Sequence, residues 1–270
     1  MRHLKIEKKK INLQSFRHRK AEESDCPELI DEDVTITLHG KSEPCLVYKT
    51  NVETGNLFKA CEKIKFRQND KRTSGVISTS RVFGYAPRNE LWNRPCRETA
   101  MAQEIPSEHE EIVKSADTAS KFYHRYAPKM AKKHQRITDN YVLAEYRLGS
   151  SMFTSGIVNE NNPLLYHFDK GNYSGRWSAM FTYKRDIEGG HLAIPEMGIS
   201  FKCSSNCLVM FDGQSFLHGV TPIVKRTKKA RRWTAVFYSL KNMWNCEPYT
   251  DEVEAMRATR TLTEISKAKK

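Results

Sequence analysis

A histidine and an aspartate close together in the sequence, with a second histidine far from both, place the strongest constraint on how this chain can fold. His167 and Asp169 are separated by one residue, and His218 follows much later. Because side chains on a strand alternate with period two, His167 and Asp169 are expected on one face, which a distant histidine can complete. A face of two histidines and one carboxylate is typical of non-haem Fe(II) sites, which leave positions open for a cosubstrate and dioxygen. The fold must therefore bring residues 167 and 218 together.

An arginine beyond the second histidine opens a mostly apolar, strand-like run from Arg232 to Tyr238. A planar guanidinium suits a carboxylate held as a bidentate pair, so Arg232 is a candidate for the far carboxylate of 2-oxoglutarate. Thr234 shares the strand face of Arg232, and its hydroxyl can reach the same carboxylate. The order of these residues reproduces the layout of the 2-oxoglutarate-dependent oxygenases.

The charge balance favours a polyanionic partner such as nucleic acid. The 270 residues include 45 Lys and Arg against 32 Asp and Glu, which gives a formal net charge of +13. One concentration of positive charge lies near the N-terminus, and a second lies between the distal histidine and the arginine. We expect this second group to hold phosphates without reading sequence, through Lys225, Arg226, Lys228 and Lys229. The alternative is that the charge only solubilises the chain.

Composition also bears on the compartment and the cysteines. No apolar run reaches the length of a membrane span, so no membrane partner is expected, and we predict an intracellular monomer, nuclear if the source is eukaryotic. The seven cysteines are scattered without paired metal-ligand spacings, which favours reduced thiols. Cys203 and Cys207 are predicted to be packing or turn residues rather than a zinc site.

Several other conspicuous side chains have a structural interpretation. Trp177, Trp233 and Trp244 fall among strand positions and are predicted to lie in the core. His191 follows two glycines and is predicted in a turn or on the surface, although it could approach the cosubstrate.

Helix signals are strongest in the middle of the chain. Pro106 precedes a capping-box pattern of Ser107 and Glu110, and apolar residues then recur at helical spacing. Pro128 is expected to end this helix and begin another.

The second half of the chain consists of short strand-like runs separated by turn residues, a pattern typical of β structure. Short strands are predicted from about residue 140, including strands over 141–148, 152–158 and 164–169. Their number and spacing indicate a mainly β fold with flanking helices (α+β), built on a double-stranded β-helix or jelly-roll core at about 140–245. We predict a mobile basic arm over 1–25 and a single dioxygenase domain over 26–270. A C-terminal helix is expected at about 250–270.

The chain resembles the TET and base-J-binding-protein (JBP) family of nucleic-acid pyrimidine hydroxylases. The resemblance is carried by residues 166–172, 218–222 and 232–238. It implies that Fe(II) is bound by His167, Asp169 and His218, and that Arg232 binds 2-oxoglutarate. It also implies that Asn172 contacts a base flipped out of double-stranded DNA and that Tyr238 stacks on this base.

Leu240 stands where TET-like enzymes usually carry a base-reading histidine. The resemblance favours hydroxylation of 5-methylcytosine to 5-hydroxymethylcytosine, with further oxidation left open, over hydroxylation of thymine. Demethylation of an N-methylated DNA or RNA base and hydroxylation of a protein are the alternatives within the oxygenases. Arg226 and Arg232 have the spacing of the paired arginines of the base-repair enzymes, but the accompanying asparagines are missing. A basic nucleic-acid-binding domain with a degenerate metal site is the non-enzymatic alternative.

Overall fold

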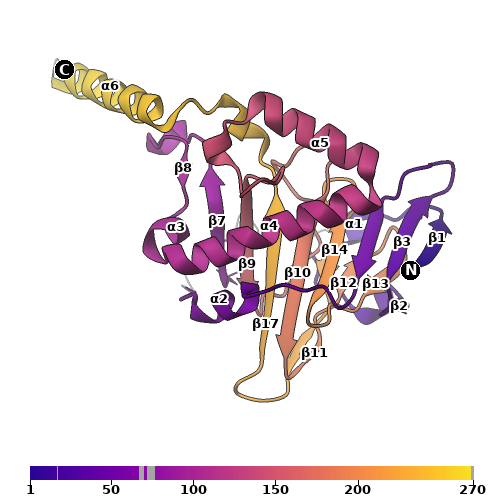
Figure 1. Cartoon of the computed structure of the whole chain (residues 1–270). Coiled ribbons are helices and arrows are strands. Elements are labelled where there is room, and N and C mark those ends of the chain that lie inside the picture. Colours follow the sequence, from indigo (N-terminus) through magenta and orange to yellow (C-terminus); the bar gives the residue numbers. More distant parts are fainter. Residues whose placement is uncertain (17, 67–69, 72–76, 269–270) are drawn as a thin grey trace.

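A sheet of nine strands, covered on both faces, forms the centre of the computed structural model (Figure 1). The structure describes residues 1–16, 18–66, 70–71 and 77–268. In spatial order the strands of this major sheet are β1 (Arg2–Ile6), β3 (Val34–Leu38), β4 (Leu46–Lys49), β14 (Cys207–Phe211), β10 (Ser178–Arg185), β17 (Arg231–Tyr238), β9 (Ser155–Glu160), β7 (Ser80–Ala86) and β8 (Arg97–Glu98).

A minor sheet faces part of the major one. Its order is β15 (Gly219–Val220), β12 (Leu192–Ile194), β13 (Ile199–Phe201) and β2 (Glu28–Ile30). A hydrophobic core between the two sheets includes Ile194, Phe201, Val209 and Phe211. Two short pairs complete the β structure, β11 (Ile187–Gly189) with β16 (Ile223–Lys225) and β5 (Asp70–Lys71) with β6 (Ile77–Ser78).

Helices cover the other face of the major sheet (Figure 1). Two long helices cross it, α4 (Pro106–Tyr126) and α5 (Pro128–Tyr141). The shorter elements are α1 (Leu13–Phe16), α2 (Leu57–Lys63), α3 (Ala100–Glu104), η1 (Glu23–Asp25), η2 (Glu90–Trp92), η3 (Ala144–Tyr146) and η4 (Lys241–Asn245). The predicted mainly β class with flanking helices and a jelly-roll core is confirmed, with the major sheet layered between helices and the minor sheet.

Strand β14 shows why the major sheet can be buried on both faces. Cys207, Val209 and Phe211 pack into the core between the sheets, whereas Leu208 and Met210 pack beneath the helices. Because neighbouring side chains on a strand point to opposite faces, a continuous apolar run satisfies both cores at once.

The predicted helix boundaries hold at the two prolines but not at the cap. Pro106 and Pro128 are the first residues of α4 and α5, as expected. The capping box predicted at Ser107 is wrong, because the N-cap of α4 is Ile105 and no side chain makes a capping hydrogen bond there.

Two of the predicted strands are also wrong. The segment 141–148 contains the last residue of α5 and the turn η3, and its buried apolar residues are Tyr146 within that turn and Val142 and Leu148 on either side of it. The segment 164–169 forms only an isolated bridge, between His167 and His218. Scattered backbone hydrogen bonds hold it instead, such as Asp169 N–H to the Gly213 carbonyl at 2.9 Å.

The N-terminal segment differs from the predicted mobile arm. Strand β1 pairs in parallel with β3, and Leu4 and Ile6 pack against the core between the sheets. These two residues alternate with Lys5, a period-two pattern that the surrounding charge obscures in the sequence. Further along, Lys8 forms an ion pair with Glu196 at 2.9 Å.

The cysteines also depart from expectation at one place. Cys96 and Cys246 form a disulfide across 150 residues of sequence, so the prediction of reduced thiols is wrong for this pair. Local spacing carries no signal for such a distant pairing, because only the fold brings the two residues together. Cys203 and Cys207 are unpaired and buried, which confirms their role in packing.

Two of the three tryptophans predicted in the core are confirmed, since Trp177 and Trp233 are buried. Trp244 is not a core residue, because it is 40% exposed and stacks on Tyr141 at 5.7 Å between ring centroids. The C-terminal helix α6 (Tyr249–Ala268) extends away from the sheets (Figure 1), and residues 269–270 of the predicted helix lie outside the described residues. Among the helices that the structure describes, none has a stretch long and apolar enough to cross a membrane.

The aromatic cluster on β17 generates a stability prediction. The Phe237 side chain is fully buried, and its ring meets those of Phe83, Phe153 and Phe181 at 5.0–6.3 Å. We expect Phe237→Ala to lower the free energy of unfolding by about 3–5 kcal/mol in chemical denaturation, because it leaves a cavity. Val82→Ala on β7, where the side chain is 50% exposed, is the matched control. Equal losses in the two variants would contradict this account of the core.

Candidate active site

The fold brings together the three residues that the sequence singled out as metal ligands. One ligand atom each from His167, Asp169 and His218 lies within 4.8 Å of the others. The Asp169 carboxylate oxygen is 3.8 Å from Nε2 of His167 and 3.7 Å from Nε2 of His218. Two imidazole nitrogens and one carboxylate oxygen that can bind one face of a metal ion are the donor set of a non-haem Fe(II) site.

Backbone hydrogen bonds fix this arrangement. His167 and His218 exchange their N–H and carbonyl groups at 3.0 Å in both directions, and their rings lie 4.3 Å apart. Nδ1 of His167 is 2.8 Å from the Leu165 carbonyl, and Nδ1 of His218 is 3.0 Å from the Phe216 carbonyl. A carbonyl that accepts from Nδ1–H leaves the Nε2 lone pair for a metal, so both rings are oriented as ligands.

Gly213 makes room for the ligands. A Cβ at this position would lie 2.2 Å from Asp169 Oδ2 and 3.2 Å from His218 Cε1. A side chain here would therefore displace the carboxylate, so the close approach of the backbone explains why glycine follows Asp212.

Arg232 lies further along the same cavity and has the features of an anion site. The side chain is 1% exposed, yet Nε and Nη2 have no hydrogen-bond partner. Unpaired buried donors cost free energy, and those of a charged guanidinium cost most, so such atoms call for a ligand. A carboxylate such as that of 2-oxoglutarate would satisfy both donors, and the residues present fit this cosubstrate.

The neighbours of Arg232 add positive potential and leave space. Lys184 lies opposite Arg232 on β10, and burial lowers the pKa of its ammonium group. His191 is buried rather than on the surface as predicted. Burial, followed by the charges of Lys184 and Arg232, lowers its pKa to about 4, so His191 is neutral near pH 7. Gly190 is needed because a Cβ would lie 2.9 Å from the Arg232 side chain.

The residues predicted to contact a base lie at the other end of β17. Asn172 forms an isolated bridge with Leu240, and both line the cavity together with Tyr238. The Asn172 amide nitrogen donates to Asp169 Oδ2 at 3.3 Å and to Ser178 Oγ at 3.2 Å. The candidate base contacts are thus joined directly to a candidate metal ligand.

One cavity of about 220 Å³ is lined by the three candidate metal ligands, by Arg232 and by the candidate base contacts. Arg232, Thr234, Val236 and Tyr238 line it from alternate positions of β17, and the residues between them face the helices. Sequence reasoning missed several polar residues of the wall, which come from β9, from the turn after it and from β10. These residues are Asn159, Asn162 and Ser178. Nothing in their local sequence marks them, because only strand pairing places them beside Thr234 and Asn172.

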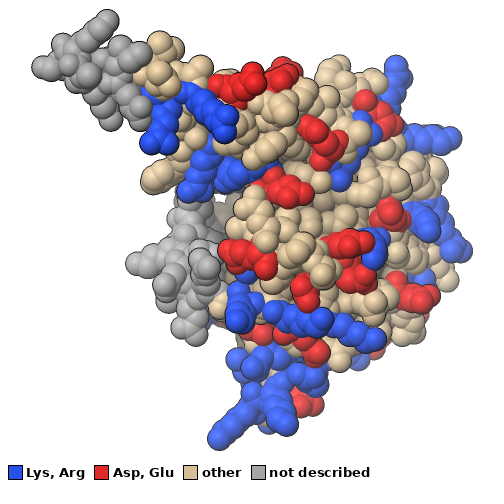
Figure 2. Space-filling model, turned by 60° about the vertical axis from the view of Figure 1, so that its left-hand side comes forward, with Lys and Arg blue, Asp and Glu red and all other residues tan. Residues whose placement is uncertain are grey.

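The predicted phosphate-binding residues lie away from Tyr238. Lys225 is the last residue of β16, and the connection from β16 to β17 carries Arg226, Lys228 and Lys229 beyond the Arg232 end of the strand. Figure 2 shows Lys and Arg gathered at the tip where Figure 1 places this connection. Arg226 forms an ion pair with Glu188, whereas Lys228 and Lys229 line a separate surface hollow. Six residue steps of strand, about 20 Å, separate Arg232 from Tyr238.

Comparison with known proteins identifies the family. The model of the TET/JBP oxygenase domain of the 2OGFeDO superfamily matches residues 82–241. The chain is similar to the bifunctional helicase and thymine dioxygenase JBP2 of Leishmania braziliensis, with 27% identity over 53% of this chain and 13% of the relative. It is also similar to the thymine dioxygenase JBP1 of Trypanosoma brucei brucei, with 26% identity over 61% of this chain and 19% of the relative. The chain therefore spans a small part of the length of these relatives.

The fold has a counterpart among solved structures. NgTET1 in complex with 5mC DNA superimposes with a TM-score of 0.62 and 12% identity, covering 85% of this chain and 86% of that one. At this identity the likeness concerns the fold alone. Since the family model covers more than half of the residues, the chain belongs to the TET/JBP oxygenase family of the 2OGFeDO superfamily.

Proposed function

We propose that the chain catalyses the Fe(II)- and 2-oxoglutarate-dependent hydroxylation of the C5-methyl group of 5-methylcytosine in DNA. The observation that carries the proposal is a single cavity with three parts. These are the unpaired donors of Arg232, the ligand set around Asp169, and the wall formed by Asn172, Tyr238 and Leu240. These parts suit a dicarboxylate cosubstrate, a metal and a planar base, respectively.

Each part has a separate task. When bound, iron and 2-oxoglutarate supply the oxidation of a C–H bond by dioxygen, coupled to loss of carbon dioxide from the cosubstrate. Arg232 holds the far carboxylate, and Thr234, whose hydroxyl accepts a hydrogen bond from Asn159 at 3.2 Å, can donate its own proton to it. Because His191 is neutral near pH 7, Arg232 and Lys184 carry the positive charge in this part of the structure.

The base must leave the duplex to reach this cavity. A methyl group in stacked DNA is out of reach, and flipping costs a few kcal/mol that contacts with the base must return. Tyr238 offers a ring for stacking at the mouth, and the Asn172 amide offers hydrogen bonds to the base edge. Lys228 and Lys229 lie beyond Arg232, which is itself about 20 Å along the strand from this end, so they would contact phosphates away from the target nucleotide.

The orientation of Asn172 supports 5-methylcytosine. Its amide nitrogen donates to Asp169 and Ser178, so the amide oxygen remains as an acceptor for the base. Asn172 donates to the candidate metal ligand Asp169, so a base whose C5-methyl group faced the metal would bring its C4 substituent near the Asn172 amide. Cytosine carries an amino donor at C4, whereas thymine carries a carbonyl acceptor there. An acceptor in this position favours cytosine.

Hydroxylation of thymine is the second candidate, because the curated relatives are named thymine dioxygenases. Leu240 is compatible with thymine, since this side chain provides no hydrogen bond that would distinguish the two bases. An N-methylated base is the remaining alternative within the same chemistry.

The first prediction concerns the metal ligands. Replacing His167, Asp169 or His218 with alanine should abolish Fe(II) binding in anaerobic calorimetric titration and should abolish release of succinate, because two ligands hold the ion too weakly. The His39→Ala variant, altered in an exposed turn, should bind iron like the wild type. Tight iron binding by Asp169→Ala would place the metal elsewhere.

A second prediction separates the cosubstrate from the metal. Arg232→Ala should raise the dissociation constant for 2-oxoglutarate about a hundredfold, because a bidentate charged pair is lost, while Fe(II) binding is retained. The neighbouring Arg231→Ala, which removes a more exposed side chain paired with Glu160, should leave this constant unchanged. If both arginine variants bound 2-oxoglutarate equally well, its carboxylate would have another partner.

The third prediction concerns the base. Duplexes containing 5-methylcytosine or thymine are incubated with the loaded protein and digested to nucleosides for mass spectrometry. We expect 5-hydroxymethylcytosine as the main product. Leu240→His should increase the preference for 5-methylcytosine over thymine about 3–10-fold, because it adds a hydrogen bond to the base. Leu143→His, at an exposed position, is the control. Formation of 5-hydroxymethyluracil alone would move the substrate to thymine.

A further inference from the structure

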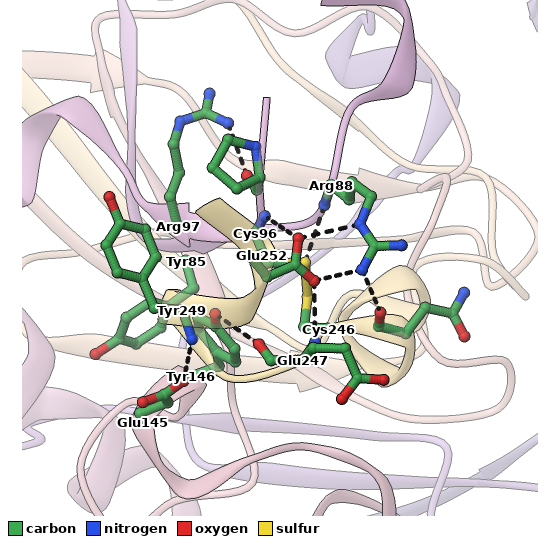
Figure 3. The surroundings of a disulfide bond; sticks show 12 residues. Tyr85, Arg88, Cys96, Arg97, Glu145, Tyr146, Cys246, Glu247, Tyr249 and Glu252 are labelled. Carbon is green, nitrogen blue, oxygen red and sulfur yellow. Dashed lines mark hydrogen bonds and ion pairs between the residues drawn. A yellow bond between two sulfur atoms is a disulfide. The ribbon is translucent and has the colours of Figure 1, made fainter. Parts of the chain in front are cut away.

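The Cys96–Cys246 disulfide lies at the base end of the cavity. It joins the segment after β7 to the segment after β17, and its Cα atoms are 5.8 Å apart (Figure 3). Cys96 is fully buried and Cys246 is 7% exposed. The bond therefore links two stretches of chain that no strand pairing joins in the described structure.

A buried ion pair ties the start of α6 to the same point (Figure 3). The Glu252 side chain has no exposed surface and accepts hydrogen bonds from Arg88 Nε at 3.0 Å and Nη2 at 2.5 Å. It also accepts from the backbone N–H of Cys96 at 3.1 Å and of Glu247 at 2.9 Å. Burial would raise the pKa of Glu252, but the hydrogen bonds from Arg88 and the two backbone groups lower it below its usual value.

The disulfide packs against the chain that carries the base-contacting wall. Cys96 and Cys246 share a hydrophobic cluster with Tyr173 and Met243, and Leu240 packs against this cluster. Tyr173 donates its N–H to the Ser239 carbonyl at 3.1 Å, and Lys241 donates to the Gly171 carbonyl at 2.9 Å. These bonds flank the Asn172–Leu240 bridge on both sides. The cluster is thus the support behind Asn172 and Leu240.

The other end of the cavity does not depend on this support. Arg232 and Thr234 lie on β17 between β10 and β9, and the two histidine ligands hold each other through reciprocal backbone bonds. Loss of the disulfide would loosen the base wall and leave Arg232, Thr234 and the two histidine ligands in place.

We propose that the Cys96–Cys246 disulfide is a redox-dependent clamp that positions Asn172 and Leu240 for the target base, so that reduction weakens binding of modified DNA without weakening binding of 2-oxoglutarate. This inference rests on the proposed function in taking that wall as the base site. A thiolate of a dithiol reductant attacks Sγ of Cys246, the more exposed of the two residues. Cys96 leaves as a thiolate and takes up a proton. The second thiol of the reductant then releases Cys246, and the reductant becomes a disulfide as the protein gains two thiols.

The Arg88 backbone favours this order of events. Its N–H donates to Sγ of Cys96 at 3.1 Å, which stabilises negative charge on the leaving sulfur. The Arg88 guanidinium also balances the charge of Glu252 beside the two cysteines.

The test compares oxidised wild type, wild type treated with dithiothreitol, and Cys96→Ser/Cys246→Ser, all as the full chain. Hydrogen exchange is measured over 88–97, 171–173 and 239–252, with β9 and β10 as internal references. Fluorescence anisotropy with a duplex containing 5-methylcytosine gives the DNA affinity, and calorimetry gives the 2-oxoglutarate affinity. Cys45→Ser, in the core between the sheets, is the control for removing a thiol.

Reduction should speed exchange in the three segments and weaken DNA binding about tenfold, with 2-oxoglutarate binding unchanged. The double serine variant should behave like the reduced wild type and should not respond to dithiothreitol, whereas Cys45→Ser should respond fully. Unchanged exchange at 171–173 on reduction overturns the clamp, and so does a parallel loss of 2-oxoglutarate binding, which would show general unfolding. Exchange needs no DNA, so failure of the oxidised protein to bind DNA counts against the proposed function alone, and the exchange result still decides the clamp.

Discussion

The register of β17 is the constraint on which the rest of the structure depends. The strand is paired on both sides, with β10 and with β9, and its side chains alternate between two environments. Trp233, Ala235 and Phe237 fill the core beneath the helices, whereas the residues between them line the cavity. A slip of one residue would turn Arg232 into the helix layer and Phe237 into the cavity. The apolar core therefore fixes the positions of Arg232 and Thr234, the two side chains of this strand that we propose for the cosubstrate carboxylate.

The parts of the site that could be predicted from the sequence are those whose chemistry is unusual for their surroundings. Packing alone gives no reason for a histidine and a carboxylate one residue apart, for a distant histidine, or for an arginine at the start of an apolar run. The fold places all of these residues on one cavity. The expectation that a regular strand holds His167 and Asp169 on one face is wrong. His167 and Asp169 lie not on a regular strand but on a segment held by an isolated bridge and by the Gly213 carbonyl.

What the sequence could not reveal depends on long-range pairing. Asn159 becomes part of the wall because β9 pairs with β17, and the Cys96–Cys246 bond joins residues that have no local relationship. His191 was expected in a turn or on the surface, but it is buried because Gly189 lets the backbone pass close to Pro222 and Gly190 lets it pass close to Arg232. The N-terminal strand could not be predicted because charged residues dominate its composition. Only two of its positions provide apolar contacts.

The two ends of the cavity are held by different kinds of structure, and this difference bears on specificity. At the Arg232 end the groups project from paired strands, where position is fixed by many backbone hydrogen bonds, as suits a cosubstrate of constant shape. At the base end Asn172 and Leu240 lie on irregular segments, whose positions depend on one bridge, a small hydrophobic cluster and a disulfide. Irregular segments tolerate substitution better than paired strands do. Under the proposed function, selectivity for the base can therefore change through residues such as Leu240 while the metal and carboxylate sites are preserved.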